Sequence, residues 1–87
     1  MTRVVIYTTP YCPYCTRAKA LLGSKNVSFE EIDVSNDSKK RAEMEKLSRR
    51  RTVPQIFIDD KPIGGYDDAL ELDSTGELDR LLLGESH

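Results

Sequence analysis

The chain has 87 residues and carries 13 Lys and Arg side chains against 15 Asp and Glu side chains, a net charge of −2 at pH 7. This length predicts one small domain, residues 1–87, with a single core. The near balance of charge gives no general case for nucleic acid or membrane binding, and no apolar run approaches the roughly 18 residues of a membrane span. We therefore expect small molecules or proteins as partners.

The chain runs straight into a strand-like segment, without the basic region, apolar stretch and cleavage site of a secretory signal. Secretion is therefore not indicated, and we expect a cytoplasmic protein. Thiols are kept reduced in that compartment. The pair Cys12 and Cys15, spaced as Cys-x-x-Cys, thus indicates redox catalysis more than a structural bridge.

The first two predicted elements flank this pair. The run Val4-Val5-Ile6-Tyr7 is β-branched and aromatic, which predicts a strand over residues 3–8 that ends in a turn at Thr9-Pro10. A helix is predicted over residues 13–22, with Gly23-Ser24 as its stop. It is predicted because apolar residues recur at i, i+3 and i+4, namely Ala18, Leu21 and Leu22.

A second strand and a second helix follow. Residues 27–34 predict a strand, because apolar residues are interleaved there with polar ones. Asn36 and Asp37 are candidate N-caps of a helix that continues through Leu47. Its apolar stripe is thin and consists of Ala42, Met44 and Leu47.

The last part of the chain predicts a hairpin and further helix. Gln55–Ile58 and Pro62–Gly64 flank Asp59-Asp60-Lys61, and Pro62 argues for an edge strand. A helical region starts at Asp67 and is interrupted near Ser74-Thr75-Gly76. The order is a right-handed βαβ unit followed by αββα. We therefore predict an α/β fold, in which three or four helices cover a four-stranded mixed sheet.

The two cysteines receive different expected roles. Cys12 lies at the N-terminus of the first predicted helix, with Pro13 in the first turn, where a missing N–H costs nothing. Unpaired N–H groups and the positive end of the helix dipole favour a thiolate there. We expect Cys12 to be the nucleophile. Cys15 lies one turn deeper and within reach, and is expected to be the resolving thiol.

Three other interpretations of the cysteines stay open. A structural disulfide is disfavoured, because closing so small a loop contributes only about 2 kcal/mol. A zinc site needs four ligands, whereas the chain has two cysteines and one histidine, His87, so no metal ligands are predicted. The third interpretation is a pair of inert buried thiols.

Three motifs together carry a family resemblance. Cys12-Pro13-Tyr14-Cys15 resembles the active-site motif of the dithiol glutaredoxins, and residues 52–58 and 64–68 resemble two further motifs of that family in order and spacing. The resemblance covers essentially the whole chain. It implies the thioredoxin fold, a cis Pro54 beside the cysteines, and glutathione as co-substrate with no tightly bound cofactor.

The resemblance also implies a set of glutathione contacts. These are Tyr14, Thr52, Val53, Pro54, Gly65, Tyr66, Asp67 and Asp68. The Val53 backbone would pair with the cysteinyl backbone of glutathione, as an added strand does. The γ-glutamyl carboxylate would take the backbone of Tyr66 and Asp67, and the α-amino group the side chain of Asp67 or Asp68. Ordinary alternatives are a trans proline, a flexible Gly64-Gly65 bend and plain helix capping by the aspartates.

The chain departs from the family pattern at three positions. Thr9 stands where Lys or Arg is usual, and Arg41 or one of residues 49–51 is a candidate to replace that charge. Arg49 occupies the place of a glycine that commonly ends the second helix. Tyr66 replaces a cysteine or another small residue, which removes an oxidation site and adds an aromatic ring.

Charge along the chain has two interpretations. Basic side chains crowd the middle and acidic side chains dominate the last third, which is typical of solvated helix faces. The same distribution also fits a site with one basic and one acidic side. Such a site would suit a zwitterionic peptide.

The expected function is glutathione-dependent thiol-disulfide exchange. By resemblance, a monomer reduces protein disulfides and protein-glutathione mixed disulfides, and glutathione resets it. One alternative is an electron donor reset by thioredoxin reductase. Another is a dimer that carries a [2Fe-2S] cluster on Cys12 and glutathione. Pro13 disfavours the carrier, because cluster-carrying relatives usually have a small residue there.

Overall fold

The computed structural model describes residues 2–84, which form four strands and four helices in the order βαβαββαα. The elements are β1 (Val4–Thr8), α1 (Pro13–Ser24), β2 (Glu30–Asp33), α2 (Ser38–Ser48), β3 (Gln55–Ile58), β4 (Lys61–Gly64), α3 (Tyr66–Ser74) and α4 (Glu77–Leu82). No helix in this part of the chain has both the length and the apolar character needed to cross a membrane.

The strands form the predicted four-stranded mixed sheet, in the order β2-β1-β3-β4. β1 runs parallel to β2 and antiparallel to β3, and β4 is antiparallel to β3. Pro62 lies on β4, at an edge of the sheet, as its missing N–H predicts. The hairpin turn contains only Asp59 and Asp60, both in the left-handed region, and Lys61 already belongs to the strand.

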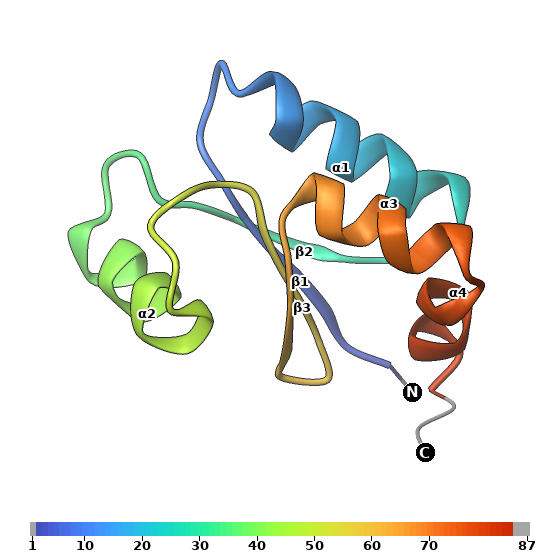
Figure 1. The fold of residues 1–87 in the computed structure, drawn as a ribbon. Helices are drawn as coiled ribbons and strands as arrows, with labels where there is room; N and C mark the ends of the chain where they lie inside the picture. The colour runs from blue at the N-terminus through green and yellow to red at the C-terminus, as the bar shows by residue number, and fades with distance from the viewer. Residues whose placement is uncertain (1, 85–87) are drawn as a thin grey trace.

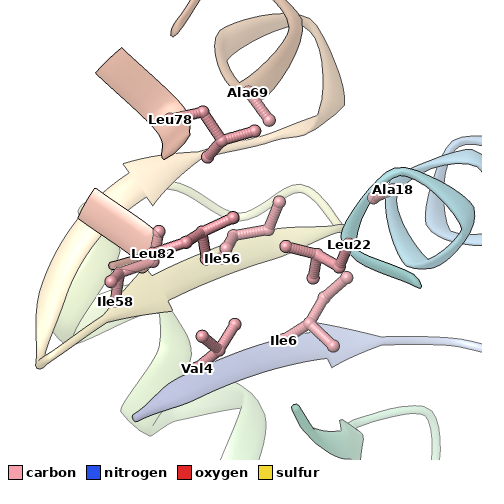
Figure 2. Close-up of a cluster of buried hydrophobic side chains, with 9 residues drawn as sticks. All are labelled: Val4, Ile6, Ala18, Leu22, Ile56, Ile58, Ala69, Leu78 and Leu82. Carbon is pink, nitrogen blue, oxygen red and sulfur yellow. The ribbon is translucent and has the colours of Figure 1, made fainter. Parts of the chain in front are cut away.

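The helices cover the two faces of the sheet unequally, with α2 on one face and α1, α3 and α4 on the other (Figure 1). Side chains of β1 alternate between these faces: Val4 and Ile6 join the larger core, whereas Val5 and Tyr7 join the smaller one. Figure 2 shows the larger core, where strand and helix side chains converge. It contains Val4, Ile6, Ala18, Leu22, Ile56, Ile58, Ala69, Leu78 and Leu82.

The smaller core depends on α2, and here the predicted apolar stripe is mostly wrong. Met44 is fully buried, whereas Ala42 is exposed and Leu47 is 52% exposed. Met44 packs with Val34 and the β1 and β3 side chains of that face. Of the predicted stripe, Met44 is thus the residue that joins the smaller core.

Two of the predicted boundaries differ from the structure by two residues or more. The second strand begins at Glu30 rather than Val27, although Val27 and Phe29 still pack against the larger core from the preceding loop. α1 continues through Ser24, two residues past its predicted end. Gly23 therefore does not stop the helix, and the left-handed residue that redirects the chain is Asn26 (φ 58°).

Candidate active site

Cys12 caps the N-terminus of α1. Its backbone is extended, Pro13 begins the helix, and the Sγ atom accepts a hydrogen bond from the Cys15 N–H at 3.1 Å. The sulfur thus takes the place of the oxygen in an ordinary N-cap, where it satisfies one of the free N–H groups of the first turn. Cys12 is partly exposed, and its Sγ lies 3.9 Å from the carbonyl oxygen of Val53.

Cys15 has the opposite environment. It is 2% exposed, and both cysteines are free thiols. Burial raises the pKa of Cys15 to about 12, and its hydrogen bond and proximity to Cys12 act in the same direction. At neutral pH the Cys15 thiol is therefore protonated. The partly exposed sulfur and the buried one are adjacent but differ in access to solvent.

The loop between α2 and β3 forms one wall beside the cysteines. α2 ends at Arg49, whose backbone is left-handed (φ 61°), and the Val53-Pro54 bond is cis, as the resemblance implies. Gln55 is buried at the start of β3 and holds this loop, because its Nε2 donates to the Thr52 carbonyl oxygen at 3.0 Å. The backbone of Val53 is thereby placed next to Cys12.

The N-terminus of α3 forms the opposite wall. Gly65 is its N-cap, and its N–H donates to Oδ2 of Asp68 at 2.8 Å. Gly64 must be glycine here, since its φ is 108° and a Cβ atom would lie 2.5 Å from Oδ2 of Asp68. The two glycines are thus more than a flexible bend, and Asp68 does act as a helix cap.

A cleft of about 190 Å³ lies between these walls. The implied glutathione contacts all line it, together with Arg50: Tyr14, Arg50, Thr52, Val53, Pro54, Gly65, Tyr66, Asp67 and Asp68. The rings of Tyr14 and Tyr66 are 6.4 Å apart between centroids, and Arg17 stacks on Tyr14 at 5.4 Å. A larger cavity of about 270 Å³ lies against α2 and is lined by none of these residues.

The charges of the cleft come from both walls. Nη1 of Arg50 lies 2.7 Å from Oδ2 of Asp68. The Arg50 guanidinium and the Gly65 N–H lower the pKa of Asp68. Among the basic residues proposed to replace the usual charge at Thr9, only Arg50 lines the cleft. Arg51 instead pairs with Glu45 at 3.6 Å, and its side chain is 90% exposed.

The sequence named Arg50 only as one of several possible cations. The run of three arginines before Thr52 indicates a basic residue near the cleft, but the sequence does not show which of the three side chains lines it. Within residues 2–84, no cluster of three or more Cys, His, Asp or Glu side chains could hold a metal ion. His87, considered in the zinc interpretation, lies outside the described residues.

The chain is similar to known glutaredoxins in sequence. The glutaredoxin family model matches residues 4–63. Glutaredoxin 3 of Escherichia coli strain K12 is 58% identical over 82 residues, which are 94% of this chain and 99% of that protein. Glutaredoxin 1 of Rickettsia typhi is 52% identical over 81 residues, 91% of this chain and 78% of that protein.

Solved structures agree in fold. The solution structure of glutaredoxin from Brucella melitensis is 50% identical and has a TM-score of 0.87, over 100% of this chain and 95% of that one. The crystal structure of a buckwheat glutaredoxin-glutathione complex is 30% identical with a TM-score of 0.86, over 95% of this chain and 78% of that one. The sheet order and helix placement are therefore those of the predicted thioredoxin fold. The chain belongs to the glutaredoxin family of glutathione-dependent thiol-disulfide oxidoreductases.

Proposed function

We propose that Cys12 is the attacking sulfur, that Cys15 resolves, and that the cleft beside them binds glutathione. One observation carries this proposal: a partly exposed sulfur that caps a helix lies 3.9 Å from the Val53 carbonyl, at the edge of a cleft with polar walls. Strand-like backbone beside the sulfur suits the cysteinyl part of a peptide. The N-terminus of α3 suits its γ-glutamyl carboxylate.

In the monothiol route, the Cys12 thiolate attacks the glutathionyl sulfur of a mixed disulfide. A Cys12-glutathione disulfide forms, and the substrate thiol leaves as a thiolate that takes up a proton. A second glutathione thiolate then attacks the bound glutathionyl sulfur. Oxidised glutathione leaves, and the Cys12 thiolate is restored.

In the dithiol route, Cys12 first forms a mixed disulfide with a protein substrate. Cys15 then loses its proton and attacks the Cys12 sulfur, which releases the substrate thiol and leaves a Cys12-Cys15 disulfide. The charge and hydrogen bonding of Cys12 help to raise the pKa of Cys15. Both contributions weaken once the Cys12 sulfur is in a mixed disulfide, so the resolving thiol becomes easier to ionise at the step that needs it.

The proposed partners are glutathione and disulfide-containing or glutathionylated proteins. A monomer in the cytoplasm fits this activity, because the glutathione pool there supplies the reductant. Tyr14 and Tyr66 flank the cleft and would pack on the bound peptide. Thr9 leaves the cysteine end of the site without the usual cation.

The test is NADPH oxidation coupled through glutathione and glutathione reductase, with a small glutathione mixed disulfide as substrate. We expect turnover that requires glutathione. A matched reaction replaces glutathione and its reductase by thioredoxin reductase, and should give none. Turnover only in the second reaction would contradict the proposed site and support the alternative electron donor.

A further inference from the structure

A hydrogen-bonded cluster of Thr8, Glu31 and Lys19 links β1, β2 and α1. The Thr8 hydroxyl on β1 donates to Oε2 of Glu31 on β2 at 2.8 Å, and Nζ of Lys19 on α1 donates to the same oxygen at 3.0 Å. Thr8 is 1% exposed, so its hydroxyl anchors the carboxylate from inside the protein. Thr8 and Lys19 lower the pKa of Glu31, which is therefore a carboxylate at neutral pH. The ammonium of Lys19 is thus held in place beside the sheet.

Lys19 lies one helical turn after Cys15. Residues four apart in a helix are neighbours on one face, with about 5–6 Å between their Cβ atoms. The side chain of Lys19 is 35% exposed, so it is partly shielded from water. Burial raises the pKa of Cys15 to about 12, whereas the Thr9 backbone and the charge of Lys19 act in the opposite direction. A positive charge is therefore held close to the buried thiol.

Other titratable groups act on Cys15 differently. Beyond burial, Cys12 raises the pKa of Cys15 through its hydrogen bond and its charge, and both require a free sulfur. The other charged side chains at this end of the molecule are exposed or line the cleft: Arg17, Arg50, Asp67 and Asp68. Once Cys12 is in a mixed disulfide, its opposition disappears and the favourable charge of Lys19 remains.

We propose that Lys19 stabilises the thiolate of Cys15 in the resolving step. Glu31, anchored by Thr8, is the positioning residue that keeps the Lys19 ammonium in place. In this step the Cys15 thiol gives its proton to water, and the thiolate attacks the Cys12 sulfur. The Cys12-Cys15 bond forms, the bond from Cys12 to the substrate sulfur breaks, and the substrate leaves as a thiolate. This inference rests on the proposed function and deepens it, because it assigns residues to the dithiol route.

The experiment follows the reaction of the reduced protein with dithiobis(nitrobenzoate) by stopped-flow absorbance. This aryl disulfide releases a coloured thiolate when Cys12 attacks it, at a rate that depends on the probe concentration. It releases a second one when Cys15 attacks the Cys12 mixed disulfide, at a rate that does not. Both rates are recorded as a function of pH. The probe has no glutathionyl group, so the result does not depend on the glutathione site.

Two substitutions should have opposite effects on the second release. Lys19→Gln should slow it about threefold at neutral pH, because water screens a partly exposed charge and a thiol of higher pKa is a stronger nucleophile once ionised. Its pH profile should move to higher pH. Glu31→Gln should speed the second release and move the profile to lower pH. Its amide oxygen can still accept both hydrogen bonds but carries no charge to offset the ammonium.

Two further variants control for charge and for structure. Lys46→Gln removes the same charge from an exposed position on α2, on the opposite face of the sheet, and should leave both releases unchanged. Lys19→Arg keeps the charge and should retain the wild-type pH profile. The first release should change by less than about twofold in every variant, since Cys12 lies about two helical turns before Lys19 and salt screens charges at that distance.

A purely structural cluster gives a different pattern, which would overturn the role of Lys19. In that case Lys19→Gln and Glu31→Gln would both slow the second release, or neither would move its pH profile. Failure of the proposed function is also distinct. If the wild type shows a single release, Cys15 does not resolve, and the inference falls with the dithiol route. If two releases occur and Lys19→Gln leaves the second unchanged, the roles of the cysteines stand and only that of Lys19 is wrong.

Discussion

The two helices that begin at the site, α1 and α3, are capped in different ways. The cap of α1 is the sulfur of Cys12, which accepts the Cys15 N–H. The cap of α3 comes from inside the helix, where the Asp68 carboxylate reaches back to the Gly65 N–H and also holds Arg50. The same task of satisfying a free N–H thus involves a partly exposed sulfur in one helix and a charged carboxylate in the other.

The largest expected effect is on activity, and it shows that Cys12 has two separable roles, as the cap of α1 and as the reacting sulfur. Replacing Cys12 by Ser should abolish all disulfide exchange, because a hydroxyl is not an effective nucleophile for this reaction. Serine is itself a preferred N-cap, so the fold should keep its stability. Activity is measured in the coupled assay and stability by urea unfolding. Residual turnover, or a large loss of stability with Cys12→Ser, would contradict this division.

The next largest effect is expected from a substitution of Cys15, which lies in the first turn of α1 beside Cys12. With Cys15→Ser, reduction of a small glutathione mixed disulfide should continue, whereas reduction of a protein disulfide should be lost. The reason is that only the dithiol route needs a second sulfur. The two substrates are compared in the coupled assay, beside the wild type. Equal loss of both activities would mean that Cys15 is not confined to the resolving step.

At α3 the expected effect is on stability and depends on pH. Removing the cap with Asp68→Ala should lower the free energy of unfolding by about 1 kcal/mol at pH 7. Arg50 and the Gly65 N–H lower the pKa of Asp68 in the folded protein from 3.8. The carboxylate therefore stabilises the fold above that value, and its contribution disappears as the pH falls through the lowered pKa.

Urea unfolding at pH 7 and at about pH 3 checks this sign, because the lower pH lies below the ordinary aspartate pKa, so that Asp68 of the unfolded chain is then largely protonated. The difference between wild type and Asp68→Ala should be larger at pH 7. Asp68→Asn is the matched variant, since its amide oxygen can still accept the Gly65 N–H. A difference that grows toward acid would show that the charge of Asp68 destabilises the fold.

The smallest expected effect is on thermal stability, from a substitution at the C-terminal end of α2, away from the N-terminal caps of α1 and α3. Arg49 ends α2 with φ 61°, a conformation that costs a non-glycine residue about 1 kcal/mol. Arg49→Gly should therefore raise the melting temperature by a few degrees, as expected of about 1 kcal/mol in a small domain. Turnover should be unchanged, since Arg49 does not line the cleft. A lower melting temperature would be the opposite result.

Local signals explain what could be predicted from the sequence. β3 has the predicted bounds because Gln55–Ile58 is a short apolar run between a proline and a turn. The sequence predicts Cys12 at a helix start because Pro13 and the apolar residues that follow form a pattern within a few positions, and α1 does begin at Pro13. The candidate contacts in residues 52–54 and 65–68 came from the resemblance and could not be derived from periodicity.

Contacts between distant parts of the chain explain what could not be predicted. The Arg50–Asp68 pair joins residues 18 apart, and the sequence offers four arginines, Arg41 and residues 49–51, only as candidates to replace the charge missing at Thr9. Leu47 fits the helical period but is half exposed, and Met44 is the buried residue of α2. Gly23 is a common helix stop but lies inside α1, since nothing at its own position requires a left-handed backbone.

The measurement that tests the central claim most directly is alkylation of the reduced protein with limiting iodoacetamide at pH 7, followed by peptide mass spectrometry. The partly exposed Cys12 should be modified, and Cys15 should stay intact. Cys15 is 2% exposed and its pKa is raised to about 12, so almost no thiolate is available there. Modification of Cys15 at a rate equal to or above that of Cys12 would contradict the assignment of nucleophile and resolving thiol.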